Sequence, residues 1–398
     1  MNCNTFNDLA RVLYDKICFL FGKFQRVDLI FDQYFKKSLK ENIRDERGIG
    51  SRLLFDETTK LPSKFNLDFL KNSANKDDLS RFLAKKFIEM HTNPQQILVV
   101  TYEHSIISSN PSLQFENDIA QCQSEEADQR VIRHVLNLKT TSKYKDILAC
   151  TYDTDVLMLL ISYSHLFSST SIDLICQFGF GDKKKYYCIN TIASSIGPDK
   201  CKALPFFHAF SGCDTVSSFY GHIKTKIWDS WFKSSNMEQI TNIFTELSNQ
   251  PKEITSTQID IIEEFLMSVY YPKNNNLESI DIDRFNHFTR LSDPNLRTLP
   301  PSRNGLTEHI KRAALQAGWI WAEAVTNVEQ QNPELWGWKT TKEGRFYPRW
   351  YIEGDTTVSV EEVCKIFTCQ KAFCKNCKCA KDGMKCLPFC KCQRECEL

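Results

Sequence analysis

Acidic residues that could bind metal ions fall into three short clusters in the middle of the chain. They are Glu125, Glu126, Asp128, Asp153, Asp155 and Asp214. Carboxylates gathered in one place repel one another unless cations neutralise them, and such oxygen ligands favour Mg²⁺ or Mn²⁺. Two ions about 4 Å apart would suit hydrolysis of a phosphodiester, because they stabilise the attacking and the leaving oxygen together.

The surrounding sequence predicts that secondary structure brings these clusters into one cleft. Asp153 and Asp155 follow the apolar run 147–152, which has the pattern of a buried strand. The first cluster opens a helix-like stretch at 125–138, and Asp214 also stands just before one. Side chains at the carboxyl ends of strands in an α/β sheet meet in the same crevice.

Short apolar strands alternate with helical patterns through the first 230 residues. Strands are predicted at 27–32, 96–102, 147–152, 173–178 and 185–189, and helices at 1–22, 77–91, 125–138 and 156–166. This alternation predicts an α/β fold with a mostly parallel sheet that helices cover on both faces.

Composition changes twice along the rest of the chain. Residues 236–330 have helical patterns at 240–247, 259–270, 282–291 and 306–328. We therefore expect an α/β domain at 1–230, a helical extension at 231–330, a Trp/Pro-rich connector at 331–363 and a small Cys-rich domain at 364–398.

Overall composition limits the classes of partner. The formal net charge is +1, so nucleic acid would have to bind at local basic patches. The start lacks a signal-peptide pattern, and no apolar run approaches the roughly 20 residues of a membrane helix. No Gly-rich phosphate-binding loop suggests a small-molecule cofactor. We expect an intracellular protein that does not bind membranes.

The order of the acidic motifs resembles the PIN-like fold of flap endonucleases and XPG-type structure-specific nucleases. The matching motifs are Phe31-Asp32, Glu126-Ala127-Asp128, Asp153-Thr154-Asp155 and Gly212-Cys213-Asp214. The whole chain is also similar to a group of animal proteins associated with mobile elements. That similarity is carried by His208 to Thr215, Asn75-Lys76, Pro300-Pro301, and Trp338 with Trp350.

The resemblance implies a three-layer sandwich and a metal-dependent nuclease acting on DNA, with RNA as an alternative substrate. It implies that two Mg²⁺ or Mn²⁺ ions are held, directly or through water, by Asp32, Glu126, Asp128, Asp153, Asp155 and Asp214. It further implies nucleic-acid contacts by Lys36, Lys40, Arg44, Arg47, Lys224 and Lys226.

Two departures from the nuclease pattern leave a second interpretation open. The family has a further metal-binding aspartate at the end of its first strand, and residues 1–25 contain no strand that ends in Asp. Its glycine-rich phosphate-binding hairpin is reduced here to Gly221 and the two lysines at 224 and 226. A non-catalytic nucleic-acid or chromatin-binding protein that keeps the fold is therefore the main alternative. A transposase with an RNase H-like triad is a weaker one, because its acids would follow a different order.

The C-terminal segment has its own chemistry. Nine of the 17 cysteines lie between Cys364 and Cys396. So short a segment cannot bury an ordinary core, and a zinc cluster would supply its folding energy. The expected ligands are Cys369, Cys374, Cys377, Cys379, Cys386, Cys390, Cys392 and Cys396. A disulfide knot is the alternative, and it would need an oxidising compartment.

The Cys-rich pattern resembles the tesmin/TSO1-type CXC domain, a zinc module that binds DNA. In that family an aromatic residue enters the minor groove, and Phe389 occupies this position here, with Lys385 and Lys391 as phosphate contacts. The resemblance implies DNA as partner and residence in the nucleus.

Each acidic motif taken alone also has a purely structural interpretation. Glu126 and Asp128 could stabilise the first turn of a helix through its dipole, and Asp214 could be an N-cap. Asp153 and Asp155 could be loop acids, and His208 is expected to be structural. The occurrence of all motifs in family order favours a shared metal pocket.

Overall fold

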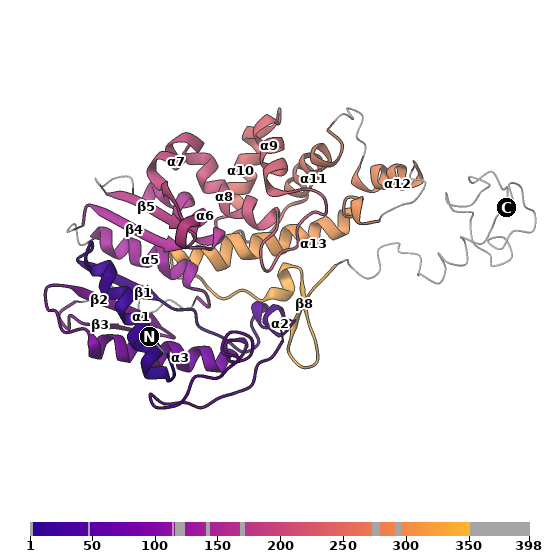
Figure 1. The fold of residues 1–398 in the computed structure, drawn as a ribbon. Coiled ribbons are helices and arrows are strands. Elements are labelled where there is room, and N and C mark those ends of the chain that lie inside the picture. The colour runs from indigo at the N-terminus through magenta and orange to yellow at the C-terminus, as the bar shows by residue number, and fades with distance from the viewer. Residues whose placement is uncertain are drawn as a thin grey trace, which may run out of the picture. The chain divides into compact units, whose positions relative to one another are not determined.

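Two three-stranded sheets form the α/β part of the molecule in the computed structural model (Figure 1). The structure describes residues 3–46, 48–113, 115, 124–140, 144–167, 172–272, 279–290 and 296–350. Residues up to Trp350 make one compact unit. Arg47 and the whole Cys-rich segment, with its predicted zinc ligands and Lys385, Phe389 and Lys391, lie outside the described residues.

Each sheet combines one parallel and one antiparallel strand pair. The first has the order β1 (Arg26–Ile30), β2 (Ile97–Tyr102) and β3 (Ser105–Ser108), and the second has the order β4 (Asp146–Thr151), β5 (Asp173–Phe178) and β6 (Lys185–Cys188). β1 runs parallel to β2, and β4 runs parallel to β5. β3 and β6 are antiparallel to their neighbours.

The expected α/β class is thus confirmed, but the sheets are mixed and not mostly parallel. Short turns are the physical reason, because a connection of a few residues can join only antiparallel strands. Glu103 adopts a φ of 45° between β2 and β3, and Gly179 and Gly181 adopt φ values of 88° and 57° between β5 and β6.

The first sheet packs against two N-terminal helices. These helices are α1 (Phe6–Phe21) and α3 (Ser73–Met90), and α2 (Leu39–Glu46) follows β1. A capping box between Thr5 and Asp8 begins α1. Ile17, Phe87 and Leu98 are buried in the core that the helices share with the sheet.

The second sheet is covered by helices that were only partly expected. They are α5 (Ala127–Thr140), α6 (Thr154–Ser162), α7 (Ile189–Ile196) and α8 (Pro198–Phe210). α8 was not predicted, because a proline within a pattern usually interrupts a helix. Here Pro205 lies inside α8, and the Phe206 N–H donates to Ser248 Oγ at 3.0 Å.

Helices follow the second sheet along the chain. They are α9 (Lys224–Lys233), α10 (Met237–Leu247), α11 (Ser256–Tyr270), α12 (Ile280–Arg290) and α13 (Arg303–Ala314), and Figure 1 shows α13 passing beneath α8 and α10. One large core continues from the second sheet through these helices to Trp336 and Trp338. None of the helices in the described ranges is long and apolar enough to cross a bilayer.

A π-helix, Leu315–Ile320, follows α13 directly. Gly318 allows it to pack closely, since a β-carbon there would lie 2.7 Å from the Leu247 carbonyl oxygen and 2.5 Å from Pro251. The remaining short elements are strands β7 (Trp338–Thr340) and β8 (Phe346–Pro348), and 3-10 helices at Phe69–Lys71, Ser164–Leu166, Gly181–Lys183, Leu296–Thr298, Trp321–Ala324 and Pro333–Trp336.

Candidate metal centre

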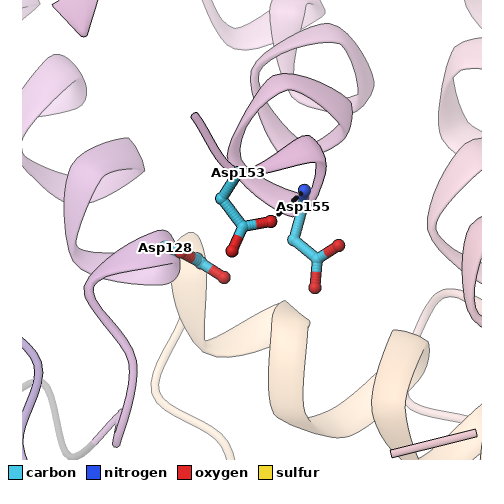
Figure 2. Close-up of side chains that lie close together, drawn as sticks. All are labelled: Asp128, Asp153 and Asp155. Atoms are coloured by element: carbon cyan, nitrogen blue, oxygen red, sulfur yellow. Dashed lines mark hydrogen bonds between the residues drawn. The ribbon is translucent and has the colours of Figure 1, made fainter. Parts of the chain in front are cut away.

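Three of the predicted carboxylates meet in one place. Asp128 lies in the first turn of α5, Asp153 is the N-cap of α6, and Asp155 lies in the first turn of α6. One carboxylate oxygen from each residue lies within 4.8 Å of the other two. Figure 2 shows the three side chains directed toward a common space. This triad could bind a metal ion.

The local sequence explains how α6 contributes two of the ligands. β4 ends at Thr151 and α6 begins at Thr154, so Asp153 takes the N-cap position. Its Oδ1 accepts a hydrogen bond from the Asp155 N–H at 2.9 Å, which satisfies one free donor of the helix start. Capping therefore fixes the Asp153 carboxylate beside that of Asp155.

Asp128 provides the strongest sign that the triad has a ligand. Its side chain is 7% exposed, and its Oδ2 is buried without a hydrogen-bond partner. Burial raises the pKa of Asp128 well above the ordinary value, and the charges of Asp153 and Asp155 raise it further. Buried polar atoms normally have partners, so an unpartnered acceptor on a carboxylate grouped with two more carboxylates fits a cation.

Asp155 has a histidine beside it. His208 Nε2, from α8, lies 2.9 Å from Asp155 Oδ1. Burial alone would raise the pKa of Asp155, but the hydrogen bond and charge of His208, together with the charges of Lys40 and Lys224, lower it. Lys224 lies behind His208, and its Nζ donates to the His208 carbonyl oxygen at 2.7 Å. Burial lowers the pKa of Lys224 to about 8.

The other three predicted acids lie around the triad but outside its ligand set. Asp32 Oδ1 accepts from the Ala127 N–H at 2.8 Å, which ties the loop after β1 to the start of α5. Glu126 forms an ion pair with Lys40, and Asp214 Oδ2 lies 3.7 Å from the same ammonium. The structure therefore brings six acids to one region and groups three of them closely.

Two cavities adjoin this region. One of about 400 Å³ lies between the ends of β1 and β4 and is lined by Asp32, Glu126, Asp128 and Asp153 together with Val131 and Cys150. The other, of about 750 Å³, is lined by Lys36, Lys40, Glu126, Trp319 and Phe346 among others. The sequence did not predict the second cavity, because its walls come from segments as far apart as Lys36 and Phe346.

The basic residues expected to contact nucleic acid have different environments. Lys36 and Lys226 are exposed. Lys40 and Arg44 instead form ion pairs with Glu126 and Glu125, and Lys224 is directed inward toward His208.

Comparisons of the chain with protein-family models, curated proteins and solved structures gave no match.

His208 is the functional candidate that sequence reasoning assigned only a structural role. A signal for it existed, because it begins the 208–215 segment that also contains Asp214. Its distance of 53 residues from Asp155 hid the pairing.

Proposed function

We propose that this protein is a divalent-cation-dependent nuclease that hydrolyses phosphodiester bonds in DNA, with RNA as the alternative substrate. The observation that carries the proposal is the Asp128 carboxylate, which has one buried oxygen without a hydrogen-bond partner and lies with those of Asp153 and Asp155. Three carboxylates and no thiolate in the group favour Mg²⁺ or Mn²⁺ over zinc.

Each part of the site would have a distinct role. A divalent cation, when bound, neutralises charge on a phosphate and makes water more acidic. Asp128, Asp153 and Asp155 would hold it, and His208 would keep the Asp155 carboxylate in place. Lys36 and Lys226, which are exposed, would contact phosphates of the bound strand.

The PIN-like resemblance and the Cys-rich segment extend the proposal. A PIN-like nuclease domain would cut, and a zinc module at 364–398 would attach the protein to DNA, as expected of a nuclear, mobile-element-derived protein. Lys385, Phe389 and Lys391 would contact DNA there.

One observation favours a second candidate, a non-catalytic DNA-binding protein. Only three of the six predicted acids form the close group, while Glu126 and Asp214 interact with Lys40. A site with fewer free carboxylates holds fewer ions, which weakens the case for catalysis by two metals.

The deciding experiment is cleavage of labelled flap, duplex and single-stranded DNA and RNA in Mg²⁺ or Mn²⁺. We expect the wild type to cleave at least one substrate, and we expect EDTA or the double variant Asp153→Ala/Asp155→Ala to abolish cleavage.

Asp146→Ala/Asp173→Ala is the matched control, since these aspartates face each other at the opposite end of the β4–β5 pair and both are exposed. It should cleave like the wild type. DNA binding by the wild type without any cleavage would favour the second candidate.

A further inference from the structure

A lysine ammonium lies among the carboxylates of the candidate metal centre. Lys40 Nζ forms an ion pair with Glu126 Oε1 and lies 3.7 Å from Asp214 Oδ2. The Lys40 side chain is only 14% exposed. Glu126 and Asp214 therefore already share a positive charge that the protein itself supplies.

The segment that carries Lys40 is held in place by the residue next to Glu126. Arg44 pairs with Glu125 at 2.5 Å, and Ser38 Oγ donates to the same carboxylate at 3.1 Å. The Gln33 N–H donates to the Glu125 carbonyl oxygen at 2.8 Å. These contacts flank Lys40 on both sides in the sequence, so its ammonium is positioned by the fold.

The two halves of the acidic region differ in how closely the Lys40 ammonium approaches them. Lys40 pairs directly with Glu126 and Asp214, whereas it acts on Asp128, Asp153 and Asp155 only through the longer reach of its charge. Asp128 Oδ2 is buried and has no hydrogen-bond partner, and it belongs to the close triad. Glu126 and Asp214 are absent from that triad and both pair with Lys40. Lys40 reaches Glu126 Oε1 only, and Glu126 Oε2 is buried without a hydrogen-bond partner. A divalent ion placed at Glu126 and Asp214 would meet the like charge of the ammonium at close range.

We propose that Lys40 takes the place of one of two divalent ions, so that the centre binds a single ion at Asp128, Asp153 and Asp155. A second ion would bind at Glu126 and Asp214 only after Lys40 is removed. This inference rests on the proposed function insofar as the triad must bind an ion.

An ammonium in the place of a second metal ion has a chemical consequence. An ammonium offers one charge and N–H donors, whereas Mg²⁺ or Mn²⁺ offers two charges and open coordination positions for water. The Glu126 side of the site would therefore attract a phosphate oxygen but would not coordinate water.

The test is a titration of Mn²⁺ into the full-length, zinc-loaded protein, with free Mn²⁺ followed by electron paramagnetic resonance. Thiolates prefer zinc to Mn²⁺, so the Cys-rich segment does not contribute to the count. We expect one Mn²⁺ per wild-type chain and two per chain of Lys40→Met. The second ion should bind at least about tenfold more tightly than any second ion does in the wild type, where Lys40 must first leave.

Three further variants make the result specific. Lys40→Gln repeats the charge removal with a polar side chain, in case Lys40→Met folds poorly. Lys40→Arg keeps the charge and should bind one ion. Lys36→Met removes an exposed charge four residues earlier, and it should also bind one ion.

The outcomes separate this inference from the proposed function. Two ions in the wild type, or one ion in both charge-removing variants, would overturn the role of Lys40 and leave the metal centre standing. No Mn²⁺ in any of these proteins would overturn the metal centre itself.

Discussion

Two aspartate–histidine pairs in this molecule have nearly the same geometry and different surroundings. Asp28 in β1 lies 2.7 Å from His134 Nδ1, and Asp155 in α6 lies 2.9 Å from His208 Nε2. Arg26 donates to both oxygens of Asp28, at 2.7 and 2.8 Å, and Thr101 Oγ1 lies 2.8 Å from the far nitrogen of His134. The first pair is thus enclosed by its own partners.

The second pair, Asp155 and His208, lies beside other carboxylates. Asp155 lies with Asp128 and Asp153 in the close triad, and its histidine is backed by Lys224. In both pairs the histidine and its neighbouring cation outweigh burial and lower the aspartate pKa. An Asp–His pair alone therefore does not indicate a metal site. What distinguishes the second pair is its grouping with two further carboxylates, one of which, Asp128, has a buried oxygen without a hydrogen-bond partner.

The largest expected effect is on cleavage. Asp155→Ala should reduce the rate about 10³-fold or more, because losing a bound cation removes several kcal/mol of transition-state stabilisation. Single-turnover cleavage of the best DNA substrate measures this. A wild-type rate for Asp155→Ala would show that the second pair is as structural as the first.

The next effect is on stability. Here the Asp28–His134 pair should matter more than the Asp155–His208 pair, whereas for cleavage the second pair matters more. Asp28→Ala should lower the free energy of unfolding by about 3–5 kcal/mol, because it leaves the buried Arg26 guanidinium without its counter-charge. Asp155→Ala should cost less than about 1 kcal/mol in metal-free protein, since it also relieves repulsion within the triad. Urea denaturation without divalent ions compares them, and equal losses would contradict the distinction.

Substitutions of the two histidines, His208 and His134, should also differ in their effects on Mn²⁺ affinity and on stability. His208→Gln should weaken Mn²⁺ binding by about 10- to 100-fold, the usual range for a residue that orients a metal ligand. His134→Gln is the matched variant and should leave Mn²⁺ affinity within twofold of the wild type while lowering stability. A comparable loss of affinity in both would mean that general loosening of the fold, and not orientation of Asp155, is responsible.

The smallest effect is a pH dependence of the metal-free protein. The pKa of Asp128 is raised on folding, so the folded chain binds more protons than the unfolded chain above pH 4, and stability falls as the pH rises through the folded-state pKa. Asp128→Asn should therefore be more stable than the wild type at pH 7, by about 1 kcal/mol.

That difference should shrink as the pH is lowered toward 4, and saturating Mn²⁺ should reverse it by stabilising only the wild type. Thermal unfolding at several pH values provides the measurement. A lower stability of Asp128→Asn in metal-free protein at pH 7 would show that Asp128 has a structural partner.

The sequence predicted the parts of this structure that depend on local pattern. Asp153 and Asp155 follow a strand, and Asp128 lies in the first turn of a helix, as the local pattern predicted. The expectation of a shared pocket also relied on the order of the motifs in the family resemblance, and it did not separate these three acids from the other three. α8 was missed because Pro205 resembles a helix breaker, and the sheets were expected to be more parallel because the turn at Glu103 was not recognised.

The sequence could not predict which charged side chains pair with one another. Lys40 was expected to contact nucleic acid, yet it pairs with Glu126, 86 residues away. A basic residue on a helix gives no sign of which acid it will meet, since that depends on how α2 packs against the segment before α5.

The π-helix at Leu315–Ile320 makes the cavity of about 750 Å³ sensitive to the loss of a single residue. A π-helix bonds i→i+5 and so holds about one residue more per turn than an α-helix. It therefore changes the direction in which the side chains after it point. Trp319 lies within the π-helix and Glu323 follows it, and both line the cavity. Deleting one residue there would restore an α-helical repeat and rotate the later side chains by about 100°. A one-codon deletion could thus turn the cavity wall away while leaving every residue of the acidic triad unchanged.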